Sequence, residues 1–156
     1  MRAMNTENAG MRYAGILVPL DGSQLAEYIL PHVVSVATTY RSEVTLLHVL
    51  GTRETAEEDL TPSQKAARAD IASYLRHTSG SLAGKGLNSL WRVSYGSPAH
   101  EIVRQTSANE TDLVMMSTHG QGARSREETG SVAMAVVSSC TIPVMLIRPP
   151  DEVAAR

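Results

Sequence analysis

The sequence predicts an α/β fold: a single doubly wound domain in which a five-stranded parallel sheet, in the order 3-2-1-4-5, carries helices on both faces. Short apolar runs typical of buried strands alternate along the whole chain with segments of helical periodicity. Parallel strands need crossover connections, and right-handed crossovers place helices on both sides of the sheet. The strand order follows if the first and fourth strands, which both end in polar loops, are neighbours at the point where the winding reverses.

The length and composition suit one compact domain. The chain has 156 residues, of which 42% are hydrophobic, and this is enough to bury a core. Residues 1–11 are polar and show no periodicity, so we expect a flexible N-terminal extension. The folded domain is therefore expected over residues 12–150.

The first strand and helix follow that extension. Residues 15–20 form an uninterrupted apolar run that ends in Asp21 and Gly22, the pattern of a buried strand followed by a turn. From residue 23 to about 39, apolar residues recur every three or four positions and predict a helix that faces the core. Pro31 lies inside this segment and should kink or delay the helix.

A second strand and a second helix come next. Residues 43–49 read as another buried strand, and residues 51–59 as a polar surface connection. Thr61 is suited to cap the following helix, with Pro62 at its first position. We expect that helix to end at Gly80 or Gly84.

The second half of the chain repeats the pattern. A third strand over 90–95 shows polar and apolar alternation, and a helix begins near Ser97 and Pro98. The remaining elements are expected over 113–116 (strand), 131–140 (helix) and 143–147 (strand), ahead of two prolines.

Two short motifs mark a phosphate-binding loop. Residues 117–120 follow the fourth strand, and after nine residues Gly130 and Ser131 open the next helix. The first N–H groups of a helix lack intrahelical partners and carry the positive end of its dipole, so together they attract anions. The pattern predicts a ligand site beyond the carboxyl ends of strands one and four. Taken alone, Ser131 would equally serve as a helix cap.

Composition excludes several other classes. The net charge of −2 and a pI near 6.2 give no basic footprint for nucleic acid. Cys140 is the single cysteine, so neither an intrachain disulfide nor a cysteine-rich zinc site is expected. No apolar run approaches the length of a membrane span and the N-terminus is not signal-like, which favours a cytoplasmic protein without a membrane partner.

Several of these segments resemble the universal stress protein family, in its ATP-binding branch. They are residues 16–23, 46–49, 96–102, 111–120, 130–133 and 140–148. The resemblance covers residues 13–149 and implies an adenine-nucleotide alpha-hydrolase-like (Rossmann-like) fold. The family's ATP signature, Gly-x2-Gly-x9-Gly-Ser/Thr, falls on Ser117, Gly120, Gly130 and Ser131. This chain departs from the family at Ser117, where the first glycine is replaced, and at residues 127–128, where two glutamates stand in place of apolar residues.

The resemblance also implies which residues bind the nucleotide. Asp21 and the backbone at Val44 would face the adenine and ribose, and Gly130 and Ser131 would hold the phosphates. The full set is Pro19, Leu20, Asp21, Val44, Met116, Ser117, His119, Gly120, Gly130, Ser131 and Val132. The expected ligand is ATP, with Mg²⁺ bridging its phosphate oxygens; AMP or cyclic AMP would use much the same pocket. No catalytic residue and no protein metal ligand is expected.

Three functions remain open at this point. The first is a stress-response regulator whose partner choice changes with ATP occupancy of the 118–130 loop. The second is a slow ATP hydrolase that uses His119 or Asp21; rapid turnover is not expected, because no GxxxxGK[ST] loop is present. The third is a scaffold without nucleotide, in which Ser117 and the glutamates at 127–128 have closed the phosphate site.

The last strand predicts self-association. If it ends the sheet, its apolar edge is exposed, and such edges tend to be covered by a partner. Universal stress proteins dimerise through their last strands. The resemblance therefore implies a two-fold homodimer in which these strands lie antiparallel, through Val144, Met145, Leu146 and Ile147.

Overall fold

The structure is a computed structural model that describes residues 12–51, 60–108, 110–120 and 130–150. The expected N-terminal extension and the two glutamates at 127–128 lie outside these residues. The described elements, in chain order, are β1 (Gly15–Pro19), α1 (Gln24–Glu27), α2 (Leu30–Tyr40), β2 (Glu43–Leu50), α3 (Pro62–Ala83), β3 (Ser89–Tyr95), α4 (Pro98–Ala108), β4 (Leu113–Ser117), α5 (Ser131–Ser139) and β5 (Val144–Ile147).

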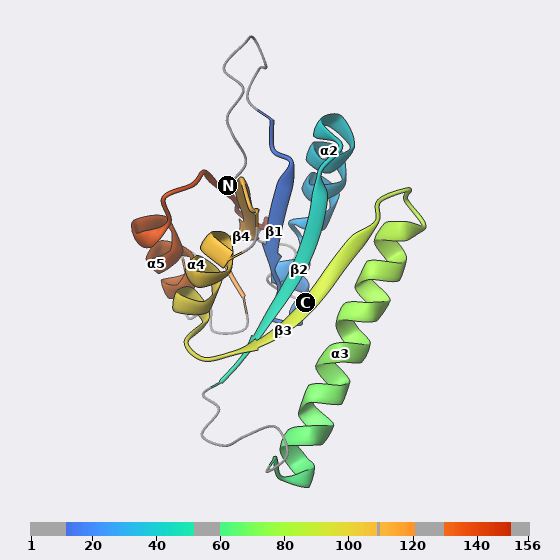
Figure 1. The fold of residues 1–156 in the computed structure, drawn as a ribbon, viewed down its shortest axis with the longest axis vertical. Helices are drawn as coiled ribbons and strands as arrows, with labels where there is room; N and C mark the ends of the chain where they lie inside the picture. Colours follow the sequence, from blue (N-terminus) through green and yellow to red (C-terminus); the bar gives the residue numbers. More distant parts are fainter. Residues whose placement is uncertain (1–11, 52–59, 109, 121–129, 151–156) are drawn as a thin grey trace.

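The predicted sheet is confirmed in both strand order and direction. The strands lie in the order β3-β2-β1-β4-β5, and every neighbouring pair is parallel. Helices α2 and α3 cover one face and helices α4 and α5 the other (Figure 1). The order reverses between β1 and β4, so this is where a doubly wound sheet opens a crevice beyond its carboxyl edge.

The core consists of two apolar clusters, one on each face of the sheet. Alternation along β1 sends Ile16 and Val18 toward α2 and α3, and sends Leu17 toward α4 and α5. All five residues of β4 are buried. A strand covered on both faces is apolar at successive positions, and this explains why the sequence shows unbroken apolar runs here.

The helix expected over 23–39 is divided into two pieces. The side chain of Ser23 accepts a hydrogen bond from the Ala26 N–H and caps the short α1, and α2 begins only at Leu30 with Pro31 in its first turn. Proline has no N–H to give to a continuing helix, and its fixed φ suits a helix start. The delay predicted from Pro31 is confirmed.

Helix α3 begins as predicted and extends beyond the first of its two expected ends. Thr61 caps it in a reciprocal capping box with Gln64, and the helix runs through Gly80 to Ala83, where Gly84 is the C-cap. The end at Gly80 was therefore wrong. Leu75 and Leu82 of α3 are fully buried against the sheet, so packing on that side carries the helix past the glycine.

Burial along the third strand does not follow the alternation that the sequence predicts. Leu90 and Trp91 are 62% and 37% exposed, and within β3 only Ser94 is buried. Strand β3 is an outer strand of the sheet (Figure 1), and neither of its faces is fully covered. Across the described residues, no helix is long and apolar enough to cross a membrane.

Candidate functional site at the carboxyl ends of β1, β2 and β4

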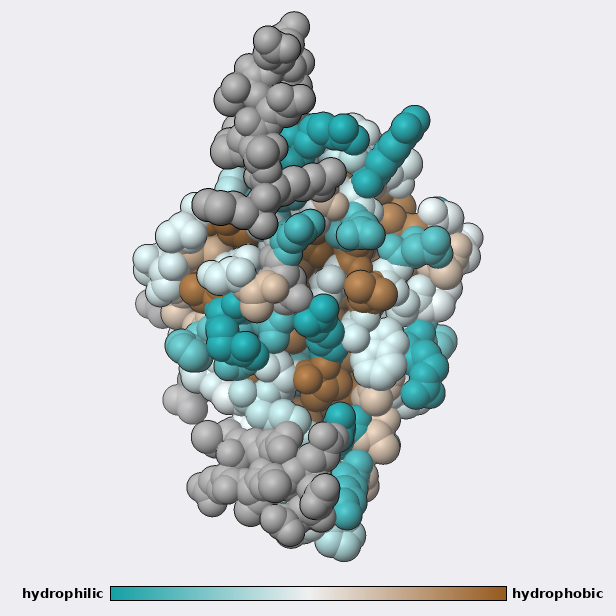
Figure 2. All heavy atoms as spheres, viewed as in Figure 1, coloured by the Kyte–Doolittle hydropathy of each residue, from teal (hydrophilic) through white to brown (hydrophobic). Residues whose placement is uncertain are grey.

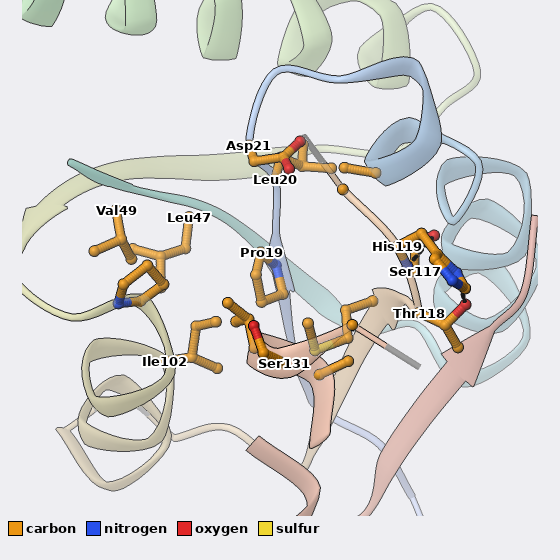
Figure 3. Close-up of a pocket in the computed structure, with 17 residues that line it drawn as sticks. Pro19, Leu20, Asp21, Leu47, Val49, Ile102, Ser117, Thr118, His119 and Ser131 are labelled. Carbon is orange, nitrogen blue, oxygen red and sulfur yellow. Dashed lines mark hydrogen bonds between the residues drawn. The ribbon is translucent and has the colours of Figure 1, made fainter. Parts of the chain in front are cut away.

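A cavity of about 240 Å³ lies where β1, β2 and β4 end and α5 begins (Figure 3). This volume accommodates a small ligand, since a single water occupies only about 30 Å³ in the liquid. Ten of the eleven residues predicted from sequence line it: Pro19, Leu20, Asp21, Met116, Ser117, His119, Gly120, Gly130, Ser131 and Val132. The strand-end and helix-start motifs therefore meet in one crevice.

The structure does not bring Val44 to this cavity. Val44 pairs with Ile16 near the start of β2 and is 1% exposed, whereas Leu47 pairs with Pro19 at the carboxyl end of β1. The residues of β2 that line the cavity are Leu47 and Val49. The placement of Val44 at the site is corrected, because only the carboxyl half of a parallel strand reaches this edge.

Asp21 is held in place by the turn that follows β1. Its Oδ1 atom accepts hydrogen bonds from the Ser23 N–H at 2.9 Å and from the Ser23 hydroxyl at 2.6 Å. Gly22 has a φ of 85°, in the left-handed region that glycine tolerates best. The turn leaves Oδ2 directed at Gly120, where a Cβ atom would lie 2.1 Å from it. Gly120 therefore permits the β1 turn to touch the loop after β4.

Gly130 closes the same loop at its other end. Its N–H donates to the Thr118 carbonyl oxygen at 2.8 Å, and a Cβ atom on Gly130 would lie 2.7 Å from that oxygen. Gly130 is the N-cap of α5, with no side-chain capping bond, and Ser131 is the first helical residue. The interpretation of Ser131 as the cap was wrong.

The start of α5 supplies backbone donors to the cavity. The first intrahelical bond described there runs from the Met134 N–H to the Gly130 carbonyl at 3.0 Å, so the N–H groups of residues 131–133 precede the intrahelical ladder. None of the described lining residues is a lysine or an arginine. An anion held by these residues would therefore be bound chiefly by backbone N–H groups and the helix dipole.

The residues after β4 form a polar wall. Ser117 is 6% exposed, and its Oγ accepts the His119 N–H at 3.4 Å. The Nδ1 atom of His119 lies 2.7 Å from the Thr118 hydroxyl, and its buried Nε2 atom has no hydrogen-bond partner among the described residues. Arg41 is the one non-glycine residue with positive φ in the described segments. Ser117 therefore has ordinary backbone geometry, and a side chain replaces the family's first glycine there without strain.

An apolar wall faces this polar one across the cavity. Leu47 and Val49 come from β2 and Ile102 comes from α4 (Figure 3). Pro98, at the start of α4, also lines the cavity. Pro98 and Ile102 were missed at this site by sequence reasoning, because in the sequence they read as a helix start and a core position. Only the packing of α4 on this face of the sheet places them here.

The contacts of Asp21 and His119 are not those of a hydrolase triad. Asp21, His119 and Ser131 all line the cavity, yet the hydrogen bonds described for the two potential relay groups lead elsewhere. The Asp21 carboxylate binds Ser23, and the His119 ring binds Thr118. An Asp–His–Ser relay requires each group to bond to the next. Among the described residues, no cluster of His, Cys, Asp and Glu could hold a metal ion.

His48 lies beside the site on the opposite face of the sheet from Leu47. Burial lowers the pKa of His48, an effect that the backbone of Leu20 and the nearby Asp21 carboxylate partly oppose. A lowered pKa keeps the imidazole neutral at pH 7. His48 therefore adds no positive charge beside Asp21 under those conditions.

A family model identifies the family to which this fold belongs. The family model described as "Universal stress protein family" matches residues 12–148. The chain belongs to the universal stress protein family. The resemblance to the family is confirmed, and the match covers every described strand and helix.

Two similar proteins illustrate the relationship. A universal stress protein of Methanocaldococcus jannaschii is 27% identical over 152 residues, covering 90% of this chain and 85% of the archaeal protein. The solved structure of the universal stress protein UspA from Lactobacillus plantarum is 26% identical, with a TM-score of 0.75, and the match covers 89% of this chain and 100% of that one.

More distant solved structures contain nucleotides. One is a universal stress protein in complex with cyclic AMP, one is an Arabidopsis thaliana family member with AMP bound, and one is the Archaeoglobus fulgidus protein in complex with dAMP. Their identities to this chain are 17%, 16% and 20%, and their TM-scores are 0.68, 0.67 and 0.66. The matches cover 90%, 89% and 88% of this chain and 100%, 94% and 99% of those chains. At these identities the likeness shows a shared fold.

Proposed function

We propose that this universal stress protein binds an adenine nucleotide, foremost ATP, in the cavity between β1, β4 and α5, and that occupancy regulates a stress response in the cytoplasm. One observation carries the proposal. Gly120 and Gly130 allow Asp21, the loop after β4 and the N-terminus of α5 to converge on a single cavity. Nucleotides bound in distant relatives support the same class of ligand.

The chemistry of the cavity matches the parts of a nucleotide. The base fits against the apolar wall, where Leu47, Val49 and Ile102 offer apolar surface. A carboxylate such as Asp21 is an acceptor for ribose hydroxyls. The phosphates would then meet the N–H groups at the start of α5, where the helix dipole favours negative charge.

The bound species would be ATP with Mg²⁺, which usually bridges phosphate oxygens and retains several waters. AMP and cyclic AMP share the adenine and ribose contacts, so both are candidate ligands of the same cavity. Ligand-induced stabilisation tests the proposal, since a ligand that binds only the folded state raises the melting temperature. Mg-ATP should raise it in a saturable way, and an unchanged melting temperature at millimolar Mg-ATP would favour the scaffold without nucleotide.

A slow ATP hydrolase is the second candidate function. It is favoured by His119, whose Nε2 atom is buried and has no hydrogen-bond partner among the described residues. A ring nitrogen in that state can accept or donate a proton beside a bound phosphate. Steady loss of ATP that His119→Ala abolishes would establish this activity, whereas equal loss in the variant would exclude His119 from it.

We further propose that the protein is a homodimer through β5. Strand β5 pairs with β4 and is the outer strand on that side of the sheet, and its four residues are half-buried: Val144, Met145, Leu146 and Ile147. An apolar edge strand is a template for pairing with a second copy. Size-exclusion chromatography with light scattering should give twice the 16.8 kDa chain mass at micromolar concentration. A species of 16.8 kDa alone would exclude the dimer.

A further inference from the structure

The opposite outer strand, β3, has a groove along the edge that faces away from β2. Helix α3 flanks one side of this groove and helix α4 flanks the other. Val93 packs with the core cluster under α3, while the Ser94 hydroxyl donates to the Glu101 carboxylate of α4. Alternation along the strand therefore places Trp91 on the α3 side and Arg92 on the α4 side.

The backbone of β3 is oriented to accept another strand. The Gly96 N–H donates to the Leu50 carbonyl of β2 at 2.9 Å, and successive residues of a strand direct their N–H and C=O groups to opposite sides. The groups of Trp91 and Val93 consequently point away from β2, into the groove. Among the described residues, β3 pairs with β2 alone. Pairs of outward N–H and C=O groups are what an added strand binds.

The rim of the groove is positively charged. Among the described lining residues, Lys65, Arg68, Arg92 and Arg104 are basic, and Glu101 is the one carboxylate. That carboxylate is already engaged, because the Arg104 guanidinium lies 2.8 Å from it and the Ser94 hydroxyl also binds it. The cationic groove belongs to a chain whose net charge is −2. The groove therefore attracts an acidic ligand, although the net charge of the whole molecule is negative.

The floor of the groove leaves room for side chains. Ala69 and Ala72 of helix α3 line it together with Trp91, which is partly exposed. On the face shown in Figure 2, hydrophilic residues surround smaller hydrophobic patches. Small residues beside an aromatic ring can hold the alternate side chains of an extended segment, while the basic rim contacts the others.

From these features we infer that the β3 edge binds an acidic, extended peptide segment of a partner protein by strand addition. The segment pairs with the outward backbone groups of Trp91 and Val93, and its carboxylates lie beside Lys65 and Arg92. A span of about seven residues matches β3, which has seven residues, because both strands rise roughly 3.3 Å per residue. The site lies outside the nucleotide cavity and does not depend on the proposed function.

Trp91 provides a local readout, because it is the only tryptophan in the chain. The probe is a capped peptide of about seven residues in which Glu alternates with Thr and Val. Titration into the full-length protein should produce a saturable shift in Trp91 emission. Arg92→Glu should weaken binding about tenfold, because it replaces attraction by repulsion. Lys85→Glu reverses an exposed charge just beyond the C-terminal end of α3 and should leave binding unchanged.

A second peptide separates strand addition from simple charge attraction. The same sequence with N-methylated backbone amides keeps its charges and loses the donors that strand pairing needs; it should bind at least about tenfold more weakly. Equal binding of the methylated peptide, or no saturable emission change with the parent peptide, would overturn the inference. Tighter binding of a single-stranded oligonucleotide of equal charge would also overturn it and would point to a nucleic-acid groove.

Discussion

Asp21 Oδ2 and Gly120 are in such close contact that a Cβ atom on Gly120 would lie 2.1 Å from the carboxylate oxygen. The contact joins the turn after β1 to the loop after β4, two segments that are about a hundred residues apart in the chain. The close approach, and not a positive φ, is what favours glycine at this position, since Gly120 is not among the residues with positive φ. The nucleotide proposal depends on this junction.

The Gly120→Ala variant tests that junction. The added methyl group must displace the Asp21 carboxylate or the loop, and overpacking of this kind costs about 1–3 kcal/mol. We expect a lower free energy of unfolding and at least about a tenfold loss of nucleotide affinity. Urea denaturation and calorimetry measure the two effects.

Gly80→Ala is the matched control. Gly80 lies inside α3, and nothing lies within 4 Å of the position that its Cβ would take. Alanine there should raise the free energy of unfolding by up to about 1 kcal/mol, because it has the higher helix propensity, and should leave nucleotide binding unchanged. If both variants bound nucleotide like the parent, the Asp21–Gly120 contact would have no part in the site.

The ion pair between Glu101 and Arg104 in α4 predicts a pH dependence of stability. Hydrogen bonds from Arg104, and next from the Ser94 hydroxyl, lower the pKa of Glu101 to about 2 against the opposing effect of burial. The folded-state pKa is below the usual 4.5, so the stabilisation is fully present above pH 4.5 and is lost as the pH falls toward 2. Glu101→Gln should lower the free energy of unfolding by roughly 1–3 kcal/mol at pH 7. This range allows for the solvent exposure of Arg104, whose side chain is 52% exposed.

Urea denaturation at several pH values between 7 and 2 checks this prediction. The parent should lose stability below pH 4.5 more steeply than Glu101→Gln, whose amide cannot titrate. Glu43→Gln, which changes an exposed carboxylate at the start of β2, is the control and should follow the parent curve closely. Parallel pH curves for the parent and Glu101→Gln would show that the ion pair contributes nothing to acid sensitivity.

The capping box of α3 is expected to contribute to the stability of the protein. The Gln64 N–H donates to the Thr61 hydroxyl, and the Thr61 N–H donates to the Gln64 side chain at 2.8 Å. Thr61→Ala removes one half of this exchange and should lower the free energy of unfolding by about 1 kcal/mol. Thr61→Ser retains the hydroxyl and should lower the free energy of unfolding much less. An equal loss in both variants, measured by chemical denaturation, would rule out the hydroxyl as the cause.

The sequence predicted the sheet because the buried strands appear as short, mainly apolar runs and each helix has its own start signal. Thr61 correctly marked a helix start and Pro31 a delay, since backbone chemistry acts locally. The strand order was predicted from the two polar strand ends, and the structure confirms it.

The sequence could not predict the register of the strands or how the helices dock on the sheet. An apolar run does not show which of its residues reach the carboxyl edge, so Val44 was chosen where Leu47 and Val49 line the cavity. Ile102 reaches the cavity only through the packing of α4. The exposure of Leu90 similarly depends on β3 being an outer strand without a cover on that face.

Titration calorimetry of ligand-free protein with Mg-ATP, AMP and cyclic AMP, at one salt concentration, tests the central claim most directly. Protein unfolded and refolded beforehand carries no copurified nucleotide. We expect Mg-ATP to bind with a micromolar dissociation constant or better, about −8 kcal/mol. Gly130→Val, which places bulk against the Thr118 carbonyl at the start of α5, should abolish that binding. Absence of heat with all three nucleotides, or equal affinity in the variant, would contradict the nucleotide site.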